Sequence, residues 1–292
     1  MGSLYRFISF PAFVNLVERR QERYVQPTLW EDTYEGYLLQ LLSKYDMDKC
    51  LDILADSLSQ GSYEMAAINY LKLYDVRWHC YGQCWTKLKE SDALWRIYSY
   101  GKMAVRIETD EEQIRDVLSP VTDFGKNLLI INDVQYDLDD ANGCPKTKEQ
   151  LLDELHTSKR IADQYFHKRK AFEHEQEKRV IFVDPSKATR TSFNIWALLY
   201  NWQSSVVGKN EKMSDEECKE LLFNGCKEWY KAINPEVHEQ MKFFPINNLD
   251  KYIKSVMVHP QAEEWIVELV ECICRRVRLN FCGKYQMYSD IS

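Results

Sequence analysis

The sequence has no long apolar segment. No stretch approaches the roughly 18 consecutive apolar residues needed to cross a bilayer. Residues 1–13 also lack the basic start and the long apolar run of a signal peptide. We therefore expect a cytoplasmic protein that makes no membrane contact.

A disulfide framework and an excess of positive charge are missing as well. The nine cysteines are odd in number and scattered over 292 residues, unlike those of a small secreted domain, so we expect free thiols. The net charge of −7 gives no overall basic field that would attract a phosphate backbone. The charge does not support nucleic acid as a partner, although a local basic groove would remain compatible with one.

Several catalytic motifs are absent. The chain has no Walker A loop, GxGxxG fingerprint, HExxH pair or GxSxG elbow, which disfavours common nucleotide hydrolases, Rossmann dehydrogenases, zincins and α/β-hydrolases. His79, Cys80 and Cys84 lie close enough in sequence to supply zinc ligands, but a second dense pair is missing. Because free cysteines are commonly buried, we expect buried thiols and no metal.

The composition favours a large folded core, with 45% hydrophobic and 13% aromatic residues. The irregular order of expected strands and helices predicts an α+β fold, and the lack of repeats or linkers predicts a single domain over residues 1–292. Apolar residues at helical spacing predict a helical insertion around 34–73. We expect further helices at 12–23, 91–100, 147–169, 214–233 and 260–278, and strands at 4–9, 24–29, 76–86, 102–108, 128–138, 180–183, 254–259 and 280–288.

Two segments are unusual in composition. In residues 84–101, helical spacing places Leu94, Trp95 and Tyr98 on one face and Gly101 at the helix end, which indicates either a packed aromatic face or a binding surface. In the second segment, an extended backbone would place Glu175 and Glu177 on one face, about 7 Å apart. Such a pair is typical of a solvated edge, or of a site that meets developing positive charge.

Taken together, these segments resemble the successive motifs of family 2971 of bacterial domains of unknown function. Order and spacing are preserved along nearly the whole chain, although Glu31 and Thr33 stand where the family usually has Asn and Pro. The matching positions are Tyr5-Arg6, the turn at 30–35, Cys84-Trp-Thr86 with Trp95, Tyr98 and Gly101, and Phe172 with Glu175, Glu177 and Arg179.

The resemblance implies likeness to the Arg-Ser-Glu class of ADP-ribosyltransferases. That class has an arginine on an early strand, a serine or threonine at a central strand end and a Glu-x-Glu before a later strand. In this chain Arg6, Thr86 and the pair Glu175 and Glu177 follow in that order. The implied fold is a mixed, ADP-ribosyltransferase-like split β-sheet flanked by helices, and the implied substrate is NAD.

Each residue has a role in that chemistry. A guanidinium binds a pyrophosphate bidentately, which suits Arg6, next to Tyr5, to holding NAD. Cleavage of the nicotinamide–ribose bond gives the sugar oxocarbenium character, which the Glu177 carboxylate would stabilise. Glu175 would orient or deprotonate the acceptor, and Thr86 would fix ribose or Glu177 by hydrogen bonding.

The aromatic and basic neighbours leave alternatives open. Trp85 or Tyr98 would stack on nicotinamide or belong to the core. Arg179 would serve the site or pair with a carboxylate. We expect Arg6, Thr86 and Glu177 to converge on one cleft.

The function implied is transfer of ADP-ribose to a macromolecule, as in a bacterial toxin or phage-defence effector with a neutralising partner. Two alternatives remain: NAD glycohydrolysis with water as acceptor, and a non-catalytic domain that senses a nucleotide or binds a protein.

Overall fold

The computed structural model describes residues 2–32, 34–36, 79–122, 129–138, 161–184 and 239–286, with single positions at 217, 220 and 224. The strands are β1 (Ser3–Ser9), β2 (Gln21–Val25), β3 (Cys80–Thr86), β4 (Ala104–Asp110), β5 (Leu129–Asp133), β6 (Gln135–Leu138), β7 (His167–Arg169), β8 (Glu177–Val183), β9 (Met241–Pro245), β10 (Ser255–Val258) and β11 (Phe281–Lys284). The α-helices are α1 (Phe10–Arg19), α5 (Asp92–Ile97), α6 (Glu111–Thr122), α10 (Leu249–Tyr252) and α11 (Glu264–Val277). The 3₁₀ helices are η1 (Pro27–Leu29), η2 (Tyr100–Lys102), η3 (Ile161–Phe166) and η4 (Lys170–Glu175).

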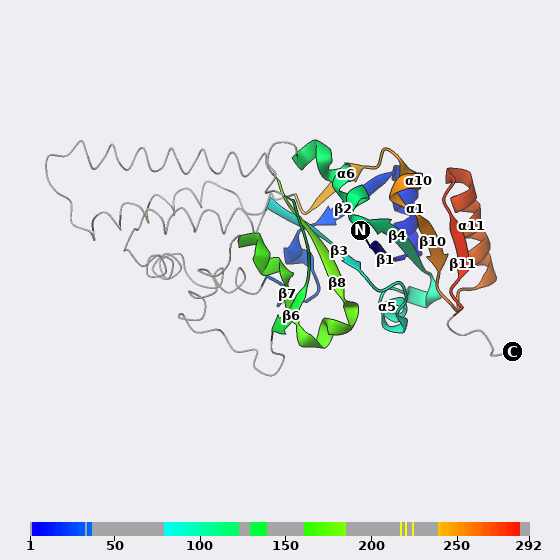
Figure 1. Cartoon of the computed structure of the whole chain (residues 1–292), viewed down its shortest axis with the longest axis horizontal. Coiled ribbons are helices and arrows are strands. Elements are labelled where there is room, and N and C mark those ends of the chain that lie inside the picture. The colour runs from blue at the N-terminus through cyan, green and yellow to red at the C-terminus, as the bar shows by residue number, and fades with distance from the viewer. Residues whose placement is uncertain are drawn as a thin grey trace.

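Nine of these strands form one mixed, largely antiparallel sheet that branches at β3 (Figure 1). Strand β8 pairs with β3 along its whole length, from Cys80 opposite Val183 to Thr86 opposite Glu177. The other edge of β3 is shared, because β2 pairs with it at Gly82 and β1 pairs with it at Thr86. One arm continues through β1, β4 and β10 to β11, the other through β2 to β9, and β5 flanks β8.

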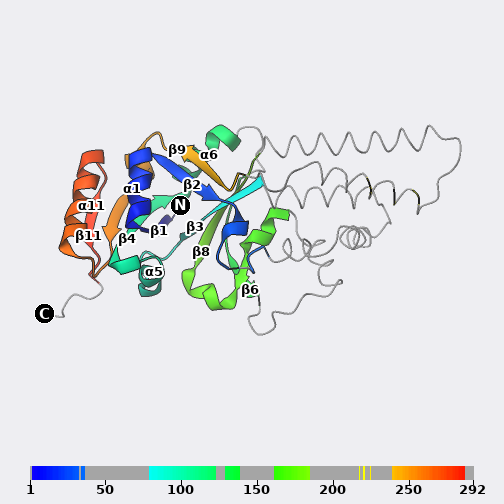
Figure 2. The same ribbon diagram turned by 180° about the vertical axis from the view of Figure 1, so that it is seen from behind.

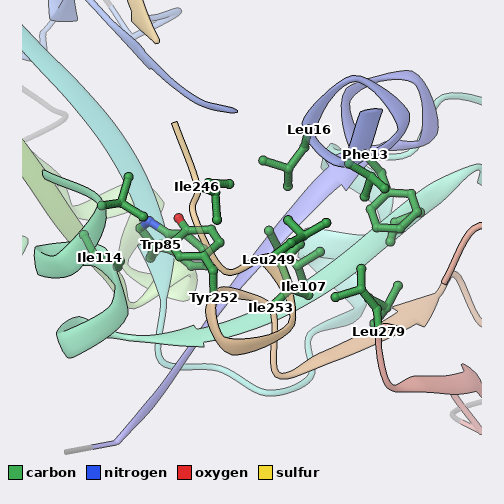
Figure 3. Packing of buried hydrophobic residues seen from close by; sticks show 14 of the residues in the cluster. Phe13, Leu16, Trp85, Ile107, Ile114, Ile246, Leu249, Tyr252, Ile253 and Leu279 are labelled. Atoms are coloured by element: carbon green, nitrogen blue, oxygen red, sulfur yellow. The ribbon is translucent and has the colours of Figure 1, made fainter. Parts of the chain in front are cut away.

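Helices cover the two faces of the sheet unequally. The main hydrophobic core lies between one face, which we call the core face, and helices α1, α6, α10 and α11 (Figures 1 and 2). Figure 3 shows Phe13 of α1 and Ile114 of α6 with the strand residues Trp85 and Ile107 in this core. The opposite face carries Tyr5, Thr86 and Glu177, and we call it the cluster face. Helix α5 covers part of the cluster face through a smaller apolar group.

Most expected strands and helices are present, with shifted ends. Helix α1 ends at Arg19 because Arg20 adopts a left-handed backbone (φ 51°), and β2 begins directly after it. The strand expected at 24–29 is wrong in its second half, where Pro27 begins η1. Tyr98 caps α5, so Gly101 does not end that helix; it lies within η2 with φ 63°.

The least accurate expectations concern charged or short segments. The sequence predicts a helix reaching 169, but residues 161–169 form η3 and β7. The strand expected at 128–138 is divided into β5 and β6, and helix α6, α10 and strand β9 correspond to no expectation. The insertion at 34–73 lies outside the described residues except for 34–36, and the helix at 214–233 lies outside them except for three positions.

None of the helices in the described ranges is long and apolar enough to span a membrane.

Candidate functional site

The three strands that carry the expected motif lie side by side. Thr86 at the end of β3 is directly opposite Glu177 on β8 on one side and Tyr5 on β1 on the other. Residues directly opposite each other in a sheet project to the same face. Tyr5, Thr86 and Glu177 therefore share the cluster face, although 81 residues separate Tyr5 from Thr86 (86 − 5) and 91 separate Thr86 from Glu177 (177 − 86).

Arg6 lies on the other face of the sheet, so the expected convergence of Arg6 with Thr86 and Glu177 on one cleft is wrong. Successive side chains along a strand alternate between the faces, and Arg6 follows Tyr5. Its guanidinium forms a bidentate ion pair with Glu22, at 2.9 and 3.0 Å, and stacks on Trp85. Arg6 thus belongs to the core face.

Of the two alternatives for Trp85, a place in the core or a ring for nicotinamide to stack on, the structure shows the first. Its side chain is buried in the main hydrophobic core, and its indole N–H donates to the Gln83 side chain at 2.8 Å. The Gln83 amide in turn donates to Glu22. A ligand bound beside Glu177 on the cluster face would not reach Trp85 in this arrangement.

Glu177 is the centre of a buried group of charged side chains. Arg179 grips its carboxylate with two hydrogen bonds of 2.7 and 2.8 Å, and the Lys168 ammonium approaches it at 3.3 Å. Glu177 and Arg179 are two residues apart on β8 and so lie on the same face. Both side chains are almost completely buried. Arg179 therefore does pair with a carboxylate.

Two further glutamates complete this group. Glu35 bridges the two cations, at 3.2 Å from the Lys168 ammonium and 3.2 Å from the Arg179 guanidinium. Glu175 accepts a hydrogen bond of 2.7 Å from Lys168. We call Glu35, Lys168, Glu175, Glu177 and Arg179 the charged cluster. With three carboxylates and two cations, it carries one excess negative charge when all its groups are ionised.

The Glu-x-Glu segment is not a solvated edge. The expectation that its backbone is extended is also wrong. Glu175 and Glu177 are both buried, at 9% and 4% exposure. Glu175 ends η4, and Gln176 adopts a left-handed backbone (φ 42°) before β8 begins. The two carboxylates come together because both bind the Lys168 ammonium, not because they alternate along a strand.

Thr86 holds the turn between the two glutamates. Its hydroxyl donates to the Glu175 carbonyl at 2.6 Å and accepts the Leu88 N–H at 3.0 Å. The Lys87 N–H also donates to the Gln176 carbonyl. Thr86 therefore acts on Glu175 through the backbone, as a positioning residue.

Two aromatic side chains, Trp30 and Tyr165, cover the charged cluster, and we call them the aromatic roof. The Trp30 ring stacks on the Arg179 guanidinium, 4.3 Å from the ring centroid, and Tyr165 contacts Trp30 edge-on. The Tyr165 carbonyl accepts a hydrogen bond from Arg179. Gly82 on β3 leaves room for the indole, because a Cβ there would lie 2.9 Å from one of the ring carbons of Trp30.

Burial and neighbouring charges act on the cluster in opposite directions. Burial alone would raise the pKa of Glu177, but Arg179 and Lys168 outweigh it and lower that pKa to about 2. For Glu35 the balance reverses, since burial raises its pKa more than Arg179 and Lys168 lower it. The cluster therefore holds one carboxylate that stays ionised and one that takes up a proton more readily.

Two side chains adjoin the cluster without belonging to it. The pKa of the Cys84 thiol is raised by burial and by the nearby Glu177. Tyr98, which remains 42% exposed, has its pKa raised by partial burial and then by Cys84, Glu175 and Glu177. Tyr98 is thus an accessible aromatic ring close to the buried carboxylates.

Within the described residues, no group of three or more His, Cys, Asp and Glu side chains could hold a metal ion. The absence of a metal stays a prediction. The described cysteines at 80, 84, 272, 274 and 282 are free thiols, as expected.

No protein-family model, curated protein or solved structure matches the chain. The resemblance to family 2971 therefore stays a prediction.

Sequence reasoning assigned no role to Lys168 or Glu35. Lys168 is surrounded by charged residues in sequence and resembles part of a solvated helix, although it is 7% exposed. Glu35 ends the turn at 30–35, which is one of the segments that carry the resemblance. The turn at 30–35 was the part of the sequence that could have pointed to Glu35, because it supplies both Trp30 and Glu35 to the site.

Proposed function

We propose that the protein cleaves NAD and transfers ADP-ribose to a macromolecular acceptor. The observation that carries this proposal is the register of Thr86 directly opposite Glu177, beside a buried group of three carboxylates. The order of the motif-bearing segments and the branching of the sheet at β3 are consistent with an ADP-ribosyltransferase-like split sheet. Arg6 has no part in the proposed site.

The proposed reaction uses the excess negative charge of the cluster. As the nicotinamide–ribose bond breaks, its electron pair leaves with nicotinamide and the ribose carbon becomes positive. A fixed carboxylate stabilises that charge without reorganising at the moment of reaction. Glu177 is the residue we assign to this role, since its low pKa keeps it ionised at neutral pH.

Glu175 is the residue we assign to the acceptor. Among the described residues, only Lys168 hydrogen-bonds to its carboxylate, whereas Glu177 is bonded to Arg179 and Lys168. Glu175 would take the proton of the acceptor nucleophile as that nucleophile bonds to the ribose carbon. The exposed ring of Tyr98 provides an aromatic surface for nicotinamide.

One observation favours a second candidate, a domain that binds a nucleotide without turnover. The Glu177 carboxylate already accepts hydrogen bonds from Arg179 and Lys168, which leaves it little capacity for a ribose hydroxyl. Retention of intact NAD, with no nicotinamide release, would support this candidate. Nicotinamide release without labelled product on a macromolecule would indicate hydrolysis instead.

The decisive test replaces Glu177 with Gln and measures nicotinamide release from NAD. We expect release to fall at least about a hundredfold, the effect of removing a preorganised electrostatic group. NAD affinity should change much less, because the interaction acts mainly in the transition state. Glu175→Gln should impair transfer of labelled ADP-ribose more than nicotinamide release.

Stability must be measured alongside activity, because Glu177→Gln weakens a buried ion pair and will itself lower stability. Glu173→Gln is the matched control, since Glu173 lies on η4 but is exposed. We expect this variant to retain wild-type release. An active wild type together with a folded, fully active Glu177→Gln variant would show that the wrong carboxylate is assigned, and an inactive wild type would refute the transferase proposal.

A further inference from the structure

Helix α11 exposes large apolar side chains on its outer surface. Trp265 is 52% exposed and Leu269 is 40% exposed, and Cys272 is also exposed. Spacings of four and three residues place the three along one side of the helix. The helix packs on the sheet with a different side, through Ile266, Val270, Ile273 and Cys274. It lies at the outer end of the sheet beside the terminal strand β11 (Figures 1 and 2).

The charges on α11 and at its two ends are divided by sign. Up to Glu271 all the charged residues are acidic, and from Arg275 onward all are basic. A second copy of the helix laid antiparallel would bring the acidic half of each copy against the basic end of the other. The acidic residues are Glu263, Glu264, Glu268 and Glu271, and the basic residues are Arg275, Arg276 and Arg278.

Trp265, Leu269 and Cys272, which we call the apolar stripe, also fit an antiparallel pair of helices. In an antiparallel pair with Leu269 opposite Cys272 of the second copy, Trp265 falls opposite Arg276 of the second copy. An arginine over a tryptophan ring is a favourable contact, and both residue types are enriched at interfaces. The same register brings Glu268 close to Arg275 of the second copy. Glu268 forms no ion pair within the described part of the chain, so its carboxylate is available for this contact.

We propose that α11 is a homodimerisation surface on which two copies pair antiparallel about a two-fold axis near residues 269–272. A two-fold contact requires a surface that is complementary to itself, and both the charges and the apolar stripe of α11 meet this condition. The existing pairs Arg275–Glu271, Arg276–Glu18 and Lys284–Glu264 are exposed and contribute little individually, so they can be exchanged for contacts with the second copy. Because a helix of this length spans only about 21 Å, the dimer should be weak and concentration-dependent.

The test is sedimentation of the full chain over the micromolar range. We expect a monomer–dimer equilibrium for the wild type. Leu269→Glu should weaken association at least about tenfold, because it places two carboxylates in the apolar centre. Ile97→Glu is the matched control, since Ile97 is an exposed apolar residue on α5, with 55% exposure, and should leave association unchanged.

A charge exchange tests the register. Glu268→Arg and Arg275→Glu should each weaken the dimer about tenfold by opposing like charges, and the double variant should recover to within about threefold of the wild type. Circular dichroism would verify that each variant is folded. A wild type that remains monomeric throughout, a dimer unaffected by Leu269→Glu, or a double variant no better than the single ones would overturn the proposal.

Discussion

The two faces of the sheet each bury an arginine gripped by a glutamate, yet the two pairs have different surroundings. On the core face, Arg6 and Glu22 form a one-to-one pair against Trp85. On the cluster face, Arg179 and Glu177 belong to a larger group, in which Arg179 also contacts Glu35, and Lys168 contacts Glu35, Glu175 and Glu177. An excess of buried charge of one sign lowers stability, and perturbed ionisable groups are more common at functional sites than elsewhere, so this difference supports placing the proposed site on the cluster face.

The largest expected effect on stability separates these two pairs. Arg179→Met leaves Glu177 without its bidentate partner and removes one of the two cations that Glu35 contacts. We expect it to lower the free energy of unfolding by about 3–5 kcal/mol. Arg6→Met removes the cation of a single carboxylate, Glu22, which keeps its hydrogen bond from Gln83, and the Arg6 side chain is 15% exposed, so its effect should fall at the lower end of that range. Denaturant unfolding would measure both.

Second substitutions sharpen the contrast. Adding Glu22→Gln to Arg6→Met neutralises the only orphaned carboxylate and should restore most of the stability. Adding Glu177→Gln to Arg179→Met should restore less, because Glu35 remains. Equal recovery by the two double variants would show that the two sites are electrostatically alike.

The next effect is a pH dependence at Glu177 of the charged cluster. Because the folded-state pKa of Glu177 is about 2, against an ordinary value of 4.5, its contribution to stability is complete above pH 4.5 and is lost as the pH falls towards 2. The contribution is on the order of 3 kcal/mol. Unfolding measured across this range should show the stability gap between wild type and Glu177→Gln narrowing in acid.

Glu35 should behave in the opposite way. Its pKa is raised in the folded state, so its contribution is complete below the unfolded value and is lost as the pH rises through the folded value. Relative to the wild type, Glu35→Gln should therefore be more favourable for stability at neutral pH than in acid. A stability gap between wild type and Glu177→Gln that stays constant from pH 4.5 to 2 would contradict the charge distribution described for the cluster.

A smaller effect should follow from crowding the aromatic roof. Gly82→Ala would place a methyl group against the Trp30 indole and 3.0 Å from the Ile181 side chain. We expect a loss of about 1–3 kcal/mol as Trp30 shifts from its position over Arg179. Gly2→Ala is the control, because nothing lies within 4 Å of its added methyl group. Thermal unfolding that does not distinguish the two variants would show that the roof is not closely packed.

The smallest effect is expected on the core face. The Tyr24 hydroxyl is buried and has no hydrogen-bond partner within the described part of the chain. Tyr24→Phe should therefore leave stability unchanged or raise it by up to about 1 kcal/mol. Tyr81→Phe, which removes a 2.9 Å hydrogen bond to the Glu239 carbonyl, should instead lower it by about 1 kcal/mol. A clear loss for Tyr24→Phe would reveal a bonded hydroxyl.

The sequence predicts local features of this molecule better than the contacts between them. The α+β class and strands such as β1, β4 and β10 follow from residue patterns, because alternation and composition are local properties. Helix α6 could also have been found, since Asp110 accepts the Gln113 N–H at its start, in the manner of an N-cap. The burial of Lys168 could not, because it depends on Glu35, 133 residues earlier (168 − 35).

In the candidate site, too, local features could be predicted from the sequence better than contacts between distant segments. The resemblance supplied Thr86, Glu175 and Glu177, which do meet at the strand ends. It misplaced Arg6, because the face of a strand residue depends on a register that is set by pairing with β3 and β4. A one-residue difference in that register decides whether an arginine faces a substrate or the core.

The left-handed backbone at Gln176 limits which residues the middle of the Glu-x-Glu segment accepts. The Gln176 side chain is exposed, and the turn uses its backbone N–H and carbonyl in hydrogen bonds to Glu173 and Lys87. Side-chain chemistry is therefore free to vary there, whereas backbone handedness is not. In a library randomised at this position, glycine and asparagine should be enriched and valine, isoleucine and proline depleted. The relative position of the Glu175 and Glu177 carboxylates thus depends on a backbone preference at position 176 and not on the chemistry of the side chain there.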